Sequence, residues 1–258
     1  MMLRCRFRSL ALATICLLLP LGGAKAQCQL PESGTARATG VADARSILLD
    51  DGREILLAGI ETAPSWPQAQ IALAQRVAGK HLTLHGLSTQ PDRYGRFTAF
   101  ASVSGSETPV QYDLVREGLV RVSGHHDAAG CRSDLLALEQ AARTAKVGLW
   151  SDPVYDVQKA DDPMAIAAGR GDFALVEGKV RSVRESGGTI YVNFGRLWSE
   201  DFTATIPKRL ESRFTAANLA PHTLAGRHVR IRGFVEERGG PWIELRHPDQ
   251  IEFADLRQ

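Results

Sequence analysis

The chain has 258 residues, and its 31 lysine and arginine residues against 29 acidic residues give a formal net charge of +2. This near balance excludes the strong basic excess that tight binders of phosphate backbones usually show. The length allows one large domain or two small ones.

The first 26 residues have the pattern of an export signal. Three arginines within the first eight residues precede a largely apolar run over residues 10–21, and a small-residue segment ends at Ala26. Twelve residues are too few to span a bilayer, and no later run is longer, so we expect no membrane span. The predicted destination is the periplasm or the extracellular space. Without this segment, 27 basic residues face 29 acidic ones, and net charge gives nucleic-acid binding no support.

Two cysteines, Cys28 and Cys131, remain after the predicted signal. Because free thiols are a liability in an oxidising compartment, we expect them to form one disulfide, with two free thiols as the alternative. The bond would close a loop of about a hundred residues and stabilise the chain by at most ~4.7 kcal/mol in the chain-entropy model.

Composition divides the exported part into two domains. Residues 151–172 contain two prolines, two glycines and an acidic pair without sustained periodicity, which is typical of a connection. We therefore predict a first domain over 27–153, a linker over 154–172 and a second domain over 173–258.

In the first domain, apolar and polar residues alternate over several short stretches, as in β-strands, and two further stretches have helical spacing. A turn over 50–52 joins two predicted strands, and the charged stretch 92–96 joins two more. The predicted strands are 40–49, 55–60, 80–87, 97–103 and 111–122, and the predicted helices are 68–77 and 133–147.

Three motifs follow one another at a recognisable spacing. They are Asp92-Arg93-Tyr94-Gly95-Arg96, the run Leu114-Val115-Arg116-Glu117-Gly118-Leu119-Val120, and Glu139-Gln140-Ala141-Ala142-Arg143 leading to Gly148-Leu149-Trp150. In this order they resemble the staphylococcal nuclease (thermonuclease) family over residues 35–153. The resemblance implies a five-stranded OB-type barrel capped by helices.

The resemblance also implies a site, in which carboxylates bind calcium, a glutamate acts as general base and two arginines clamp the phosphate. Asp43 matches the first acidic position, and Glu61 matches a later metal-ligand position. Arg45 stands where the second metal-binding aspartate is expected, Leu56 where the first clamping arginine is expected, and Ser65 where the general base is expected.

Of the three catalytic side chains that the family implies, Arg96 alone has a matching residue. Losing a general base costs about 10²- to 10⁴-fold, and losing a charge-stabilising donor about 10²- to 10³-fold. We therefore expect little or no nuclease activity and no cofactor, with calcium required only if the site works. Arg96 either contacts phosphate or is a hairpin arginine paired with Asp92 or Glu61.

His125-His126-Asp127 is a second place where a metal could bind, since imidazole and carboxylate are good ligands. No third partner stands at a motif spacing, and Gly124 and Gly130 flank the stretch. We favour a solvated loop.

In the second domain, alternating apolar and polar residues predict five strands, over 175–183, 189–194, 202–206, 228–236 and 242–245. A short helix is predicted over 207–217. Five strands with a helix between the third and fourth is the OB-fold order. The predicted fold class is thus mainly β with helices, as two OB-type five-stranded barrels.

Basic and aromatic residues interleave in the second domain, as a face that tracks single strands requires. The candidate binding residues are Lys179, Arg181, Tyr191 and Trp242, together with Tyr94 of the first domain; Arg184, Arg230 and Arg232 are further predicted exposed cations. The alternative is ordinary outward charge, diluted by Glu236, Glu237 and Glu244.

Three functions remain open at this stage. The first is an exported protein with a degenerate nuclease-type site that binds nucleic acid or an envelope ligand. The second is an active calcium-dependent nuclease that uses Arg96, Glu61 and Asp43, and the third is a cell-envelope interaction protein that never meets nucleic acid. The sequence leaves the oligomeric state open.

Overall fold

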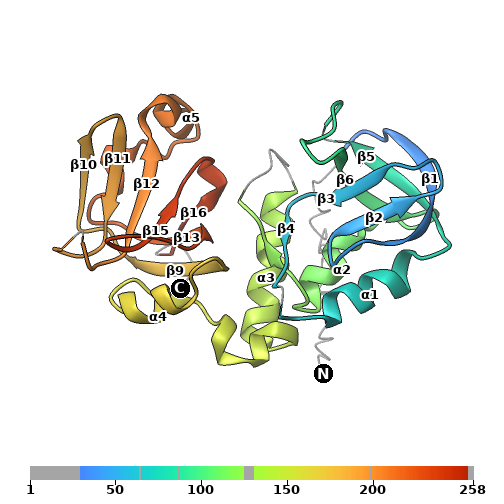
Figure 1. The fold of residues 1–258 in the computed structure, drawn as a ribbon, viewed down its shortest axis with the longest axis horizontal. Coiled ribbons are helices and arrows are strands. Elements are labelled where there is room, and N and C mark those ends of the chain that lie inside the picture. Colours follow the sequence, from blue (N-terminus) through green and yellow to red (C-terminus); the bar gives the residue numbers. More distant parts are fainter. Residues whose placement is uncertain (1–29, 64, 87, 125–130, 198, 255–258) are drawn as a thin grey trace, which may run out of the picture.

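The computed structural model describes residues 30–254 except 64, 87, 125–130 and 198. The predicted export signal, Cys28 and residues 125–127 lie outside the described residues. The chain forms two lobes, with the N-terminal half in one and the C-terminal half in the other (Figure 1). Within the described part, no helix has the length and apolar character needed to cross a membrane.

The first lobe is a closed five-stranded barrel with the order β1-β2-β3-β6-β5, in which β3 and β6 run parallel. Its strands are β1 (Gly34–Val41), β2 (Ser46–Leu49), β3 (Glu54–Leu57), β5 (His81–Gly86) and β6 (Arg96–Val103). The helices are α1 (Gln68–Val77), α2 (Val110–Arg116) and α3 (Arg132–Ala145). The OB-type order that the resemblance implied is confirmed.

Two predicted strands of this lobe were wrong. The predicted strand over 40–49 is a hairpin of β1 and β2, because Asp43 accepts a hydrogen bond from the Arg45 amide (2.8 Å) and turns the chain. The predicted strand over 111–122 begins as helix α2, whose buried Val110, Leu114 and Val115 follow helical spacing. Apolar residues at 110, 112 and 114 imitate strand alternation.

The second lobe repeats this strand order. Its strands are β9 (Phe173–Lys179), β10 (Ser182–Ser186), β11 (Thr189–Asn193), β12 (Thr203–Pro207), β13 (His228–Phe234), β14 (Glu236–Arg238), β15 (Gly240–Glu244) and β16 (Ile251–Phe253). One sheet has the order β10-β11-β12-β15-β14, and the other has β16-β13-β9-β8. Because β9 continues into β10 and β13 into β14, the two sheets form one OB-type ring, with β12 parallel to β15. Helix α5 (Glu211–Ala216) lies between the third and fourth strands of the ring, as predicted.

The segment 154–172 contains regular structure of its own. Strand β8 (Gln158–Lys159) pairs in parallel with β9, and helix α4 (Pro163–Ala168) follows it. Asp162 caps this helix by accepting a hydrogen bond from the Ala165 amide (3.1 Å), and Pro163 occupies its first turn. The segment is therefore an edge of the second lobe as well as a connection.

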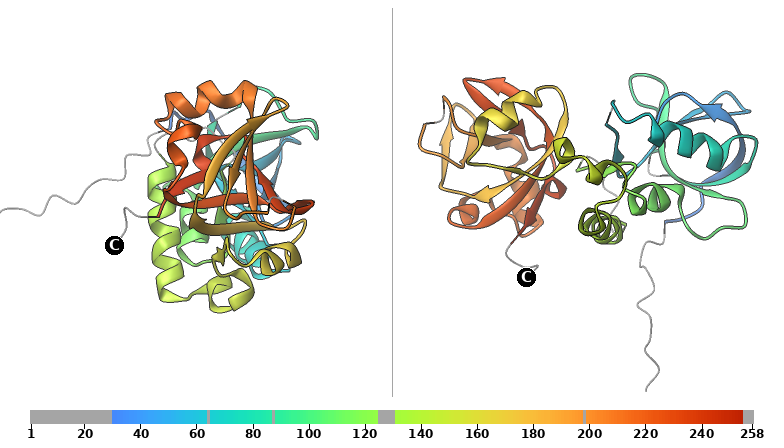
Figure 2. Two further views of the ribbon diagram at one scale, coloured as in Figure 1. Left: turned by 90° about the vertical axis from the view of Figure 1, so that its left-hand side faces the viewer. Right: turned by 90° about the horizontal axis from the view of Figure 1, so that it is seen from below.

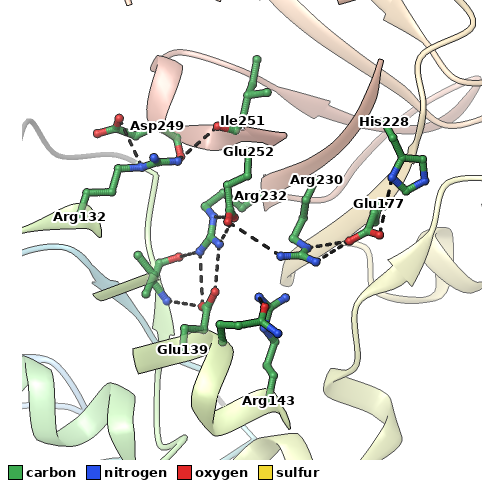
Figure 3. A network of polar contacts seen from close by, with 12 residues as sticks. Arg132, Glu139, Arg143, Glu177, His228, Arg230, Arg232, Asp249, Ile251 and Glu252 are labelled. Carbon is green, nitrogen blue, oxygen red and sulfur yellow. Dashed lines mark hydrogen bonds and ion pairs between the residues drawn. The ribbon is translucent and has the colours of Figure 1, made fainter. Parts of the chain in front are cut away.

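A buried ion network joins the two lobes beside α3, which lies between them in Figure 1 and in the right-hand view of Figure 2. Arg232 of β13 is fully buried and bonds Glu139 of α3 (3.0 Å) and Glu252 of β16 (Figure 3). It also donates to the carbonyl of Val122 in β7 (Arg121–Val122), which pairs with β4 (Ile60–Glu61). Burial alone lowers the pKa of Arg232, but Glu139 and Glu252 outweigh it and raise that pKa.

The prediction that Arg230 and Arg232 are exposed was wrong. Arg232 has no exposed surface, and Arg230 donates to Glu177 (2.9 Å) with only 14% of its side chain exposed. Both alternate with apolar residues on β13, but Glu139 and the Val122 carbonyl of the first lobe contact Arg232, and Glu177 and Glu252 of the neighbouring strands face Arg230. Alternation places them on one face and cannot tell whether water or another domain covers that face.

Further contacts extend this interface. Arg132 at the start of α3 donates to the carbonyl of Asp249 (2.7 Å). Arg121 of β7 donates to the carbonyl of Phe173 and lies 5.1 Å from the centre of the Tyr155 ring. A Cβ atom added at Gly124 would lie 2.4 Å from the Gln250 side chain, so the two lobes approach each other closely there. The two barrels are joined by buried polar contacts.

Candidate nuclease-type site and basic groove

The turn between β1 and β2 positions Asp43 and Arg45. The Ala42 amide donates to the Ser46 carbonyl (2.9 Å), and the Asp43 carboxylate accepts from the Arg45 amide, so Asp43 is used partly in shaping the turn. The Arg45 carbonyl in turn accepts from the Leu57 amide (2.8 Å). These backbone bonds hold Arg45 beside the end of β3.

From this position Arg45 reaches the only other predicted metal-ligand position. Its Nη1 lies 2.8 Å from Glu61 Oε2 and donates to the Ile60 carbonyl at 3.2 Å. Glu61 is 5% exposed and the Arg45 side chain 22%, so the carboxylate is largely shielded from water by a partly buried arginine. Burial raises the pKa of Glu61, and the charge of Arg45 offsets that rise only in part.

This donor set does not fit calcium. A hard divalent cation needs several oxygen ligands, and here a guanidinium occupies the carboxylate oxygen that would face it. Among the described residues, no group of three or more His, Cys, Asp or Glu side chains has the arrangement of a metal site. The geometry of Arg45 and Glu61 supplies no step of metal-assisted hydrolysis.

Leu56 and Ser65 stand at the other two changed positions. Leu56 is 6% exposed and lies opposite Ser46 on the neighbouring strand β2, so it provides apolar surface and no charge for a phosphate. Ser65 Oγ lies 2.7 Å from the hydroxyl of Tyr155, whose ring packs edge-on against Trp66 at 5.9 Å. The position where a base was expected therefore ties the first barrel to the start of the connection.

Arg96 pairs with Asp92, as one of the two sequence-based alternatives predicted. Asp92 Oδ2 accepts from Arg96 Nε (3.0 Å) and Nη2 (2.9 Å), and Asp92 Oδ1 caps the turn. The hydrogen bonds that Arg96 donates to the Asp92 carboxylate raise the pKa of Arg96. Tyr94 is 64% exposed, and the guanidinium groups of Arg93 and Arg96 lie 4.7 and 5.0 Å from its ring centre.

Asp43 and Glu61, the candidate metal ligands, lie in one region of the first barrel with Arg96. Asp43 is close enough for its charge to affect the pKa values of both Glu61 and Arg96. Two of these groups already have an ion-pair partner, however: Arg45 for Glu61 and Asp92 for Arg96. Asp43 has no ion-pair partner among the described residues and accepts a hydrogen bond from the Arg45 amide. The structure thus holds Glu61 and Arg96 in separate internal ion pairs.

The second barrel carries a groove of about 1170 Å³, lined from β10, β11, β12 and β15 and from the loops beside them. Four predicted binding residues line it: Lys179, Arg181, Tyr191 and Trp242. Tyr94, the fifth predicted binding residue, lies in the first barrel instead.

Sequence reasoning missed part of this lining. Arg196 and Arg238 were not among the candidates, because one lies in a loop and the other in a short strand next to two glutamates. Asn193 and Thr203 were also missed. The register supplies the missing signal, since Asn193 pairs with Thr203 and Thr203 with Trp242. Knowledge of the strand pairing alone would have placed these residues on the same face.

Residues 59–152 match the family described as staphylococcal nuclease homologue. The first lobe therefore contains a domain of the staphylococcal nuclease type, which agrees with its OB-type barrel. The match contains Glu61, Ser65 and Arg96 but begins after Asp43, Arg45 and Leu56, where the changed metal and clamp positions lie. No curated protein matches the chain.

Proposed function

We propose that this protein acts by binding and that its nuclease-type site no longer hydrolyses phosphodiesters. The observation that carries the proposal is the ion pair between Arg45 and Glu61, in which a cation stands where a metal ligand is expected. Leu56 and Ser65 support it, since neither can supply a phosphate clamp or a general base. Loss of the base and of one clamping donor together lowers the rate by about 10⁴-fold or more.

The rival function is a calcium-dependent nuclease that uses Arg96, Glu61 and Asp43. It is favoured by the location of all three in one region, and it requires Arg45 to leave Glu61 so that calcium can bind. The two functions predict different responses of the protein to calcium.

Two measurements on the purified exported chain separate them. Incubation with single-stranded DNA and RNA in millimolar calcium should leave both intact, with no more cleavage than the Arg96→Ala variant gives. Calcium should also leave the melting temperature unchanged, since a ligand that binds only the folded state raises it. Arg45→Asp removes the blocking cation and adds a carboxylate, and should create a calcium-dependent rise. Cleavage by the unaltered protein that Arg96→Ala abolishes overturns the proposal.

Export and the disulfide belong to the same proposal. The basic and apolar pattern of residues 1–26 supports export to the periplasm or beyond, and Cys131 is fully buried at the start of α3. We propose that Cys28 and Cys131 are joined. Intact mass after alkylation should detect no modified cysteine until reductant is added; two modified cysteines without reductant contradict the bond.

A further inference from the structure

The groove of the second barrel has a one-sided charge. Its lining contains the five cations Lys179, Arg181, Arg184, Arg196 and Arg238. No aspartate or glutamate is found among the described residues that line it. Because the chain as a whole carries almost balanced charge, this local excess is a property of the groove and not of the composition.

Four of the five cations of the groove have no carboxylate partner in the described part of the chain, and Arg238 has only Glu236 at 3.5 Å. Within the described residues, Lys179, Arg181, Arg184 and Arg196 have no carboxylate at ion-pair distance. Their acidic neighbours are engaged elsewhere: Glu185 bonds Lys208 (2.6 Å), and Asp201 accepts from the Leu197 amide (2.7 Å). Four positive side chains that share one groove without partners repel one another, and an anionic ligand would relieve that repulsion.

Strand pairing arranges polar and aromatic side chains in two rows across the groove. One row runs Ser182, Asn193, Thr203, Trp242 over β10, β11, β12 and β15. The next row places Arg184 directly opposite Tyr191 and continues through Thr205 to Glu244 of β15. Glu244 bonds Arg246 (2.6 Å), and Glu236, which lies opposite Trp242 at the end of the first row, faces Arg238 (3.5 Å); neither glutamate lines the groove. Directly paired residues share a face, and the alternate residues Ile190, Val192 and Ala204 are buried in the barrel core. The groove therefore combines cations with aromatic rings along a continuous strand face.

Trp242 is covered by a cation of the same groove. The guanidinium of Arg238 lies 3.7 Å from the centre of the Trp242 ring, and Trp242 is 8% exposed. Arg238 is exposed and lies 3.5 Å from Glu236, a weak surface pair. A planar group that replaced or joined Arg238 on this ring would keep the stacking contact.

We propose that this groove is a binding site for single-stranded nucleic acid, with phosphates against Lys179, Arg181 and Arg184 and bases against Tyr191 and the Arg238–Trp242 stack. A groove of about 1170 Å³ exceeds the usual volume of small-ligand pockets and suits an extended ligand. Cations beside stacking aromatics are the elements by which OB barrels hold single strands. The inference rests on the proposed function that the protein binds without hydrolysing.

The test uses the exported chain with a fluorescent thymidine oligonucleotide of about 12 nucleotides, within the site size of OB folds. Anisotropy is measured with a chelator present, so that binding is separate from hydrolysis. The double change Arg181→Ala with Arg184→Ala should weaken binding at least about 10-fold and reduce the salt slope by about 1.4. Arg209→Ala removes an exposed cation outside the groove and should change neither value.

A second variant pair tests stacking. Tyr191→Ala should weaken binding roughly 5- to 150-fold, and Tyr191→Phe, which keeps the ring, should bind like the unaltered protein. Thermal unfolding of each variant checks that the barrel remains folded. Polyphosphate of similar charge, which has no bases, should compete poorly.

Two results overturn the inference. One is absence of binding at low salt, and the other is equal competition by polyphosphate together with no effect of Tyr191→Ala, which assigns the groove to a polyanion without bases. Neither result is evidence that the first barrel has nuclease activity. Hydrolysis of the same oligonucleotide in calcium is a separate observation, and it alone removes the proposed function.

Discussion

The two barrels share one strand order but differ in whether the charged side chains on their faces have ion-pair partners. In the first barrel, the residues at the nuclease-type site are matched within the protein, as Arg45 with Glu61 and Arg96 with Asp92. In the second barrel, a face of the same fold carries cations without partners. The shared fold therefore does not set which charges are available on each barrel, and the pairing of individual side chains does.

The comparison also shows that net charge does not describe the charge of a single face. Exposed ion pairs contribute little to stability, so pairing charges at a surface mainly removes them from interaction with ligands. A chain with almost equal numbers of acidic and basic residues can leave one groove strongly positive if its acids are paired elsewhere. Lys208 with Glu185 and Arg170 with Glu237 are such pairs in the second lobe.

The largest effect is expected from a variant that breaks the ion network between the barrels. Arg232→Met removes the cation that bonds both Glu139 and Glu252, leaving Glu252 with the more distant Arg230 (3.9 Å), and should lower the free energy of unfolding by about 3–5 kcal/mol. Urea unfolding followed by fluorescence measures it. Arg209→Ala is the exposed control and should stay within about 0.5 kcal/mol of the unaltered chain.

A companion variant keeps this prediction decisive if Arg232→Met does not fold. Changing Arg232→Met together with Glu139→Gln and Glu252→Gln removes the uncompensated charges, and should recover a large part of the lost stability. If the triple variant is no more stable than the single one, the loss comes from packing and not from buried charge.

A smaller effect is expected in the pH dependence of stability, to which two buried carboxylates should contribute with opposite signs. Burial by itself raises the pKa of Glu252, but Arg232 and its neighbours outweigh burial and lower it to about 2. This pKa is below the ordinary value, so the contribution of Glu252 is present above about pH 4.5 and is lost as the pH falls toward 2. The loss is at most about 3 kcal/mol. Glu252→Gln should flatten the acid side of the stability profile measured by urea unfolding.

Glu61 should respond with the opposite sign. Its pKa is raised by burial, so the folded chain holds that proton more tightly than the unfolded chain does. Ionisation of Glu61 therefore costs stability as the pH rises above its ordinary value near 4.5. Glu61→Gln should remove this decline while leaving the acid loss due to Glu252. Identical profiles for the Glu61→Gln and Glu252→Gln variants would contradict the contrast.

Local signals in the sequence predicted much of the first barrel. Helical spacing placed α1 at Gln68–Val77, and the turn at Asp92 to Arg96 fell between β5 and β6. The assignment of Arg45, Leu56 and Ser65 to changed positions of the family's site rests on the neighbouring motif residues and stays a prediction. These features depend on residues close together in the chain.

What could not be predicted depends on distant contacts. Arg232 resembles an outward strand residue until α3 of the other barrel is placed against it. The groove residue Arg238 follows two glutamates, which disguised its contact with Trp242. The partner of Ser65, Tyr155, is 90 residues away in the chain. Charge patterns along a strand do not reveal which charges find partners across a domain boundary.

The smallest expected effect sharpens the comparison at the position where a general base was expected. Ser65 shares one hydrogen bond with Tyr155, and Ser65 is exposed, so Ser65→Ala should lower the free energy of unfolding by about 0.5–1.5 kcal/mol. For a chain of this size, that is a fall in melting temperature of roughly 1–6 °C. Tyr155→Phe removes the same bond from the other side while keeping the ring against Trp66. The double variant should therefore lose little more than either single variant, whereas additive losses would show that Ser65 and Tyr155 act separately. A coupled pair assigns Ser65 to holding the connection, and it also means that Ser65→Glu, the change that restores the family's base, must displace Tyr155 before the carboxylate can reach a substrate.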